Sequence, residues 1–169
     1  MSTMVVFESL WGNTRALAEA VAEGLGPAVT LLDVGWAPVP LPHEVDLLVV
    51  GGPTHAFSMS RASTRHDAET KGAPAGHAAR GIREWLDDLP ESDSVDVATF
   101  DSRVGTVRHL PGSAAKAAAR RVRRQRLGRL VATESFYVDD MAGPLLDGEL
   151  DRARAWGESL ALTAQRRTR

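Results

Sequence analysis

Met4-Val5-Val6-Phe7-Glu8-Ser9-Leu10-Trp11-Gly12-Asn13-Thr14-Arg15 is the stretch that decides the fold of this chain. The apolar run 4–7 has the length of a buried strand, and the turn after it offers hydroxyl, amide and glycine groups. A helix begins directly after the turn. In this order the backbone N–H groups of the turn and the N-terminus of the helix can hold a phosphate without a lysine. The stretch therefore predicts a strand–turn–helix unit that carries a phosphorylated cofactor.

The rest of the chain alternates apolar runs of strand length with helical patterns. Strands are expected over 4–7, 29–32, 47–50, 95–100 and 130–133. Helices are expected after the first turn as far as Gly26-Pro27, over 82–89, from a cap at Ser113 to Gly128, and from about Asp147 onward. Residues 60–77 are expected to form a loop with one or two helical turns over 64–71.

This alternation is typical of an α/β fold with a doubly wound parallel sheet. The runs 47–50 and 130–133 are apolar on both faces, as in a sheet that helices cover on each side. We therefore expect a three-layer α/β/α sandwich around a five-stranded sheet. Ligands of such sheets bind outside the carboxyl ends of the strands, so the loops to consider are 8–14, 51–60, 101–109 and 134–143.

The composition limits the classes of protein and of chemistry. With 169 residues, 43% of them hydrophobic and 25% charged, the chain is expected to form a single domain over 1–169. The absence of Cys excludes disulfides, thiolate nucleophiles and Cys-ligated metals, so redox chemistry would need a bound cofactor. We find no signal-peptide pattern and no membrane-spanning run, and we expect a cytoplasmic protein that does not act at a membrane.

The first loop has the groups that hold a phosphate. Ser9 and Thr14 offer hydroxyls, Asn13 offers an amide, and Gly12 lets the backbone approach an anion closely. A plain turn followed by a helix cap remains the alternative. The pattern matches neither the Gly-Lys-Ser/Thr loop nor the dinucleotide Gly-x-Gly-x-x-Gly loop, which favours a mononucleotide.

The second loop reads Gly-Gly-Pro-Thr-His-Ala-Phe-Ser-Met-Ser over 51–60. His55 and Phe57 interrupt a polar stretch and offer surfaces on which a flat ring can stack. Inward packing that anchors the loop is the alternative for Phe57, and it is the preferred interpretation for Met59.

Together these residues resemble the flavodoxin family. Ser9-Leu10-Trp11-Gly12-Asn13-Thr14 is similar to that family's phosphate-loop signature, Ser/Thr-x-Thr-Gly-x-Thr. Gly52-Pro53-Thr54-His55 resembles its second flavin loop, in which an aromatic residue commonly follows Pro-Thr. The resemblance covers nearly the whole chain and implies the strand order 2-1-3-4-5, with FMN bound at the switch point between strands one and three; this family is itself a standard example of that rule.

The resemblance also implies which residues form the cofactor site. The expected phosphate residues are Ser9, Leu10, Trp11, Gly12, Asn13 and Thr14. The residues expected to flank the isoalloxazine ring are Pro53, Thr54, His55, Ala56 and Phe57, with Asp101, Ser102 and Arg103 closing its other side. No catalytic acid or base and no metal ligand is expected.

The chain departs from the family pattern at three places. Trp11 replaces a Thr, so one hydroxyl donor is missing, and His55 stands where a Trp is common, which adds a titratable group. The loop after the fourth strand lacks the stacking Tyr of many flavodoxins. One side of the aromatic sandwich is therefore absent unless Phe57 or Phe136 supplies it.

Arg103 is a candidate for tuning the cofactor. A cation beside a flavin stabilises its anionic reduced form, by up to about 4 kcal/mol at ~4 Å and an effective dielectric constant near ~20. It would therefore raise the reduction potential. An ion pair with Asp101, or solvation, is the alternative, and the sequence leaves both open.

Charged residues of the loops predict a mixed or basic mouth to the site. The residues concerned are Arg61, Arg65, Arg103, Arg108 and His109, with Asp101, Asp139 and Asp140. The arginine run over 120–129 is interpreted as a solvated helix face rather than a nucleic-acid site, because it lacks groove-reading and aromatic elements. His43, His66 and His77 are interpreted as surface or loop residues, and Trp85 and Trp156 as core residues.

The leading hypothesis is an FMN-binding electron-transfer protein that works between a reductase and an electron acceptor, as a monomer or weak homodimer. The basic mouth favours one alternative, an FMN-dependent reductase that takes hydride from NAD(P)H and reduces a quinone-like acceptor. The missing aromatic residues permit another, a cofactor-free interaction module on the same fold.

Overall fold

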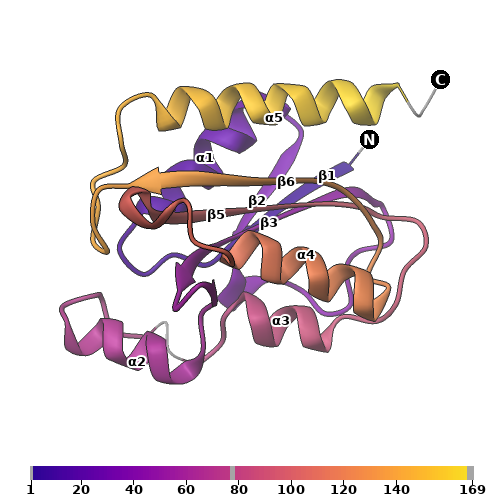
Figure 1. The fold of residues 1–169 in the computed structure, drawn as a ribbon. Coiled ribbons are helices and arrows are strands. Elements are labelled where there is room, and N and C mark those ends of the chain that lie inside the picture. Colours follow the sequence, from indigo (N-terminus) through magenta and orange to yellow (C-terminus); the bar gives the residue numbers. More distant parts are fainter. Residues whose placement is uncertain (1, 77–78, 167–169) are drawn as a thin grey trace.

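The computed structural model describes residues 2–76 and 79–166. It contains a parallel sheet in the order β2-β1-β3-β5-β6, with a short strand β4 paired antiparallel to β3 (Figure 1). The strands are β1 (Ser2–Phe7), β2 (Val29–Asp33), β3 (Val45–His55), β4 (Ser58–Met59), β5 (Asp96–Val104) and β6 (Arg129–Val138). The predicted order 2-1-3-4-5 is thus confirmed for the five parallel strands, and β4 is an addition that the sequence did not predict.

Helices cover both faces of the sheet, as predicted (Figure 1). The helices are α1 (Asn13–Leu25), α2 (Ala62–Thr70), α3 (Ile82–Asp88), α4 (Ala114–Gln125) and α5 (Glu149–Gln165), with 3-10 turns η1 (Val34–Trp36) and η2 (Gly105–Val107). Alternate residues of β1 serve the two faces, because successive side chains of a strand point in opposite directions. Val5 and Phe7 pack with α1 and α5, whereas Met4 and Val6 pack with α3 and α4.

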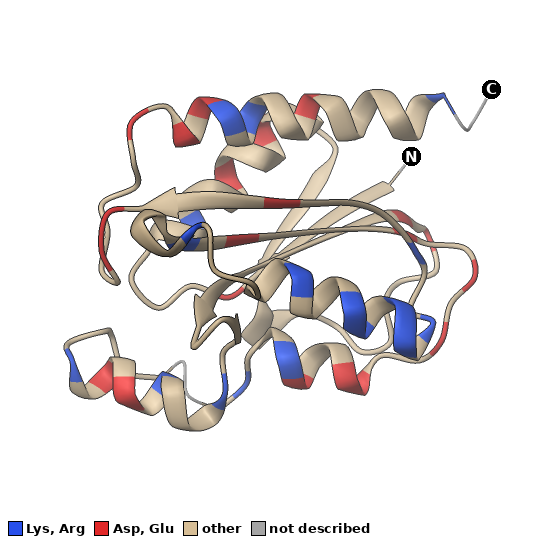
Figure 2. Ribbon diagram, in the orientation of Figure 1, with Lys and Arg blue, Asp and Glu red and all other residues tan. Residues whose placement is uncertain are grey.

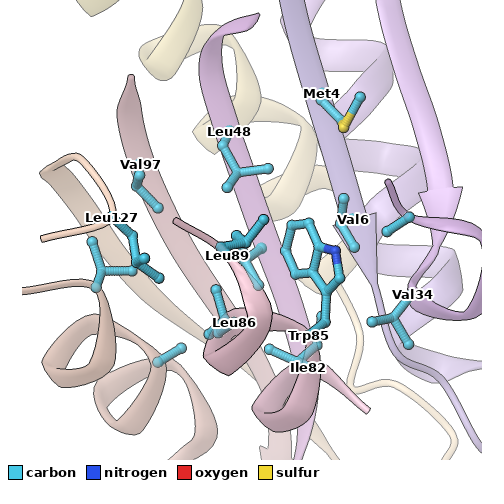
Figure 3. Packing of buried hydrophobic residues seen from close by; sticks show 14 of the residues in the cluster. Met4, Val6, Val34, Leu48, Ile82, Trp85, Leu86, Leu89, Val97 and Leu127 are labelled. Carbon is cyan, nitrogen blue, oxygen red and sulfur yellow. The ribbon is translucent and has the colours of Figure 1, made fainter. Parts of the chain in front are cut away.

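The core under α3 is built around Trp85. Its side chain is fully buried, and its indole Nε1 donates a hydrogen bond to the Pro38 carbonyl oxygen at 3.1 Å. Figure 3 shows the ring between Ile82 of its own helix and Val6 of β1. A buried ring of this size contributes substantially to the free energy of folding, and its polar atom needs the partner that it has. Met59 joins the same cluster, as predicted.

The expected strand 130–133 lies at the edge of the sheet. It belongs to β6, whose only partner strand among the described residues is β5, apart from a single bridge between Val138 and Leu145, and its residues are partly buried or exposed. The run is nevertheless covered on both faces, as expected, because Leu130 packs against the cluster that includes α4, and Val131 and Ala132 pack against the cluster that includes α5. It is less buried than 47–50, which is central in the sheet. Edge position, which composition does not encode, explains the difference.

Three strands extend further than the apolar runs predict. β3 continues to His55, β5 to Val104 and β6 to Val138. Residues that the sequence placed in loops therefore lie on the carboxyl ends of strands, where the sheet holds their positions. In the described part of the chain, no helix combines the length and the apolar character that crossing a bilayer requires.

Candidate functional site

A pocket of about 290 Å³ opens at the carboxyl end of the sheet. It lies where the strand order reverses, since β1 has β2 on one side and β3 on the other. Residues from all four predicted loops line it. Every candidate that the sequence proposed is in the lining except Gly12, Phe57 and Asp101.

The N-terminus of α1 contributes one wall of the pocket. Gly12 precedes the helix with φ +94°, a left-handed conformation that side chains rarely adopt, and its N–H donates to Ser9 Oγ at 3.2 Å. No side chain caps this helix, and its first turn has no acidic residue. The positive end of the helix dipole is thus not neutralised by the described part of the protein.

Thr14 and Asn13 hold this end of α1 against neighbouring elements. The hydroxyl oxygens of Thr14 and Ser102 are 2.8 Å apart and form a buried hydrogen bond between α1 and β5. Asn13 lies against Gly143 of the loop after β6, where an added Cβ would come 2.7 Å from the amide oxygen. Both side chains still line the pocket.

Trp11 forms a wall of the pocket together with α2. The indole is half-buried and packs with Leu10, Ala68 and Ala73. Its Nε1 is buried and has no hydrogen-bond partner in the described part of the chain. A buried N–H without an acceptor is unfavourable by about 1–3 kcal/mol, so Trp11 has an unused donor where the family pattern has a hydroxyl.

Phe57 does not flank the pocket. It forms the turn of the β3–β4 hairpin with Ala56, and both residues have positive φ values, +62° and +47°. This turn directs Phe57 outward, and its side chain is 46% exposed. Phe136 is fully buried against Phe100 and Trp156, so neither phenylalanine supplies the missing stacking ring.

His55 lies at the end of β3 and faces α2. Its Nδ1 is 3.0 Å from the hydroxyl oxygen of Thr64. Burial lowers the pKa of the imidazole, and the positive charge of Arg65 lowers it further. The ring is therefore neutral at neutral pH.

Arg103 is buried at the pocket and organises the loop that follows β5. Its Nη2 donates to the carbonyl oxygens of Val107 at 2.8 Å and Leu110 at 3.2 Å, while Nε has no partner in the described structure. The alternative of an ion pair with Asp101 or of solvation is wrong, because the guanidinium is buried and bonds carbonyl oxygens instead of a carboxylate. Its charge nevertheless lies in the pocket wall.

Asp101 and Thr54 serve the N-terminus of α4. Asp101 Oδ2 accepts from the N–H of Ala115 at 2.8 Å, and Thr54 Oγ1 accepts from the N–H of Ala114 at 2.9 Å. Ser113 is the predicted cap, accepting from the N–H of Lys116 at 3.3 Å. Burial raises the pKa of the Asp101 carboxyl. Asp101 is thus a partner of α4 and does not line the pocket.

A buried polar cluster beside the pocket was missed by the sequence analysis. Glu8 accepts from the Ser60 hydroxyl and, at 2.9 Å, from the N–H of Ile82. Arg65 donates to Ser60 at 2.9 Å and to Glu84 at 2.9 Å. Burial raises the pKa of Glu8. Arg65, expected at the mouth, is therefore wholly buried in this cluster.

Helix α2 supplies lining residues that the sequence analysis did not assign to the site. They are Thr64, Asp67, Ala68 and Lys71. The sequence predicted helical turns here but gave them no role, because the apolar spacing is weak. The Thr64 hydroxyl accepts from the N–H of Arg61 at 2.9 Å at the start of this helix, but Arg-x-x-Thr is not a capping signature that the sequence could have shown.

The remaining charged residues of the loops around the pocket are of both signs. Arg61, Arg108, His109, Asp139 and Asp140 are exposed. The arginine run lies on and after α4, well away from α2 (Figure 2), and three of its members, Arg121, Arg126 and Arg129, pair with Asp87, Glu91 and Asp96. No group of three metal-ligating side chains occurs among the residues that the structure describes. His43 and His66 are exposed as expected, and His77 lies outside the described residues.

Solved structures with the same arrangement are flavodoxins. One from the domain Archaea superposes with a TM-score of 0.63 at 18% identity, covering 98% of this chain and 99% of that one. The flavodoxin of Streptococcus pneumoniae TIGR4 gives 0.62 at 17% identity, covering 96% and 99%. A WrbA-like flavodoxin from Agrobacterium tumefaciens gives 0.56 at 21% identity, covering 98% of each.

The chain has the flavodoxin fold. No family model matches the sequence, and no curated protein matches it either. At identities near 20% the superpositions establish the architecture of this flavodoxin fold, and the chemistry of the pocket has to be argued from its own residues.

Proposed function

We propose that this protein binds FMN without a covalent bond and transfers electrons between two partner proteins, a reductase and an electron acceptor. The observation that carries the proposal is the uncapped N-terminus of α1, which opens into the pocket at the switch point of the sheet. Helix N-termini of this kind bind phosphate through free N–H groups and the helix dipole. The solved structures that share the fold are named flavodoxins.

The unused donors of the pocket fit a ligand that carries many acceptors. Trp11 Nε1 and Arg103 Nε are buried without partners in the described structure. FMN has phosphate and ring carbonyl oxygens that accept hydrogen bonds. The volume of about 290 Å³ is close to the lower end of the range for small-molecule pockets, roughly 300 Å³.

Different residues of the chain would bind the phosphate and the ring system of FMN. Ser9, Asn13, Thr14 and the first N–H groups of α1 would hold the phosphate. His55 on β3 and Ser102 and Arg103 on β5 would contact the ring system, and Trp11 with α2 would exclude water from one side. When bound, FMN supplies the redox chemistry, because its ring takes up and releases electrons.

Replacing Asn13 and Thr14 together tests the phosphate assignment. We expect Asn13→Ala/Thr14→Ala to weaken FMN binding at least about tenfold, since two polar contacts of about 1 kcal/mol each are lost. Fluorescence titration measures the dissociation constant. Riboflavin, which lacks the phosphate, is the matched control and should bind the variant and the parent protein equally. An unchanged FMN affinity would contradict the assignment, and a wild-type protein that binds no flavin would overturn the proposed function.

Replacing Arg103 tests its effect on the potential. The cation in the pocket wall favours negative charge on the ligand, so Arg103→Gln should lower the midpoint potential of bound FMN by at least about 40 mV, which corresponds to about 1 kcal/mol for one electron. Arg103→Lys keeps the charge and serves as the control. Equal potentials in all three proteins, measured by dye-equilibrated reduction, would show that the charge does not act on the cofactor.

A further inference from the structure

The Thr64 hydroxyl fixes the tautomer of His55. Thr64 Oγ1 donates its only proton to the Arg61 carbonyl oxygen at 3.1 Å and accepts from the Arg61 N–H at 2.9 Å. With its proton directed to that carbonyl, the hydroxyl acts as the acceptor for the imidazole, whose Nδ1 is 3.0 Å away. The proton of the neutral ring is on Nδ1.

The other ring nitrogen is consequently a free acceptor. In the neutral Nδ1–H tautomer, Nε2 carries a lone pair and no proton. No described residue hydrogen-bonds Nε2, and the nitrogen is not among the buried atoms that lack partners. His55 lines the pocket, so this acceptor is available to a ligand there.

The surroundings of His55 keep the imidazole neutral. The ionisable residues near it are Arg65, Asp67 and Lys71 from α2 and Arg103 from β5. Three of these four are cations, and Asp67 is paired with Lys71 at 3.8 Å. A positively charged imidazole would be repelled in this setting. The acceptor form therefore persists across the neutral pH range.

We propose that His55 is a ligand-binding residue whose Nε2, held by Thr64, accepts a hydrogen bond from an N–H or O–H group of the molecule in the pocket. The other polar lining groups with unused capacity, Trp11 Nε1 and Arg103 Nε, are donors. His55 thus adds the complementary polarity and selects ligands that carry a donor. The inference rests on the proposed function in one respect: FMN is the ligand, with a ring N–H and ribityl hydroxyls as possible donors.

The tautomer can be measured without any ligand. Long-range 1H–15N correlation spectra of the imidazole should show a protonated Nδ1 and an unprotonated Nε2 in the wild-type protein at pH 7. Thr64→Val, which removes the anchoring hydroxyl, should give a mixture of tautomers, and Thr64→Ser should restore the single form. A protonated Nε2 in the wild-type protein would overturn the proposal whether or not FMN binds.

Titration with FMN tests the contact itself. His55→Phe keeps a flat ring and loses the acceptor, so we expect binding to weaken about fivefold to tenfold, the value of one hydrogen bond. His55→Gln offers an amide oxygen and should bind within about threefold of wild type. His66→Gln, an exposed histidine on the same helix as Thr64, is the control and should change nothing.

Two further results separate the possible outcomes. Lumiflavin has the ring but no ribityl chain, so an equal effect of His55→Phe on both flavins assigns the donor to the ring, and an effect on FMN alone assigns it to the chain. Equal loss in His55→Phe and His55→Gln, or no loss in His55→Phe, would overturn the proposal. Absence of flavin binding by the wild-type protein would overturn the proposed function, whereas the ligand-free spectra would still decide the tautomer.

Discussion

The N-termini of α1 and α4 lie at the same edge of the sheet and differ in their partners. Side chains satisfy α4: Thr54, Asp101 and Ser113 accept hydrogen bonds from successive N–H groups of its first turn. Helix α1 begins at Gly12, with no capping side chain and no acidic residue. The chain therefore closes the N-terminus of α4 with its own side chains and leaves that of α1 open, which is the end that the proposed function assigns to the phosphate.

The N-terminus of α3, like that of α4, has N–H groups that are hydrogen-bonded by side chains of the protein. The N–H of Ile82 donates to Glu8, and Glu84 of the same helix accepts from the N–H of Gly81 at 2.9 Å. Two of the three helix N-termini described here thus have a carboxylate of the chain as a partner. Helix α5 also lacks a capping side chain but carries Glu149 and Asp151 in its first turn, whereas α1 has neither a cap nor an acidic residue there.

The largest effect is expected when a substitution introduces a carboxylate at the N-terminus of α1, where α4 has Asp101 at its own N-terminus. Asn13→Asp places a negative charge at the open end, which should stabilise the helix and repel the phosphate. We expect the dissociation constant of FMN to rise at least about a hundredfold, or about 2.7 kcal/mol, with no loss in the free energy of unfolding. Riboflavin should bind as before. If FMN still binds tightly, the comparison between α1 and α4 does not describe the site.

A pH series on Glu8 tests the closed end of α3. Because burial raises the pKa of Glu8 above its ordinary value of 4.5, the folded state binds its proton more tightly than the unfolded state does. The stabilising contribution is complete below pH 4.5 and is lost as the pH rises toward the folded-state pKa. Glu8→Gln should therefore gain stability relative to wild type as the pH rises, by at most about 1.4 kcal/mol per pH unit. Urea unfolding at several pH values measures this, and parallel stability curves would contradict it.

The smallest effect is expected at the cap of α4. Ser113→Ala removes the acceptor for the N–H of Lys116, and the free energy of unfolding should fall by about 1 kcal/mol. FMN affinity should stay the same, because the N-terminus of α4 stabilises the fold and is not the proposed phosphate site. Ser113→Asp, which keeps a cap, is the matched control. A loss of FMN affinity as large as that of the Asn13 and Thr14 variant would remove the distinction between the two helix ends.

The sequence predicts the architecture and the position of the open helix end at α1 because both depend on local patterns. Apolar runs, Gly26-Pro27 and the cap at Ser113 mark the elements, and the polar turn before α1 marks the open helix end. Each of these signals lies within a few neighbouring residues.

The side of the pocket formed by β3 and β5 could not be predicted as well, because it depends on turns and on burial. A two-residue hairpin turn with positive φ usually contains Asn or Gly, and Ala56-Phe57 gives no such signal, so the exposure of Phe57 was missed. The sequence places Arg65 among the exposed charges of the mouth and leaves open whether Arg103 points inward. Only their partners in the fold, Ser60 and Glu84 for the first and the carbonyl oxygens after β5 for the second, place them inside.

The position of Trp11 has a practical consequence for every titration described above. This indole stands in the wall of the pocket, whereas Trp85 is sealed in the core beneath α3. A flavin that binds in the pocket absorbs light at the wavelengths at which an indole emits. It therefore quenches the fluorescence of the nearest tryptophan most strongly. The fluorescence of Trp11 therefore reports how much of the pocket is occupied. Comparing the emission of a Trp11→Phe protein with that of the parent protein would isolate the contribution of Trp11.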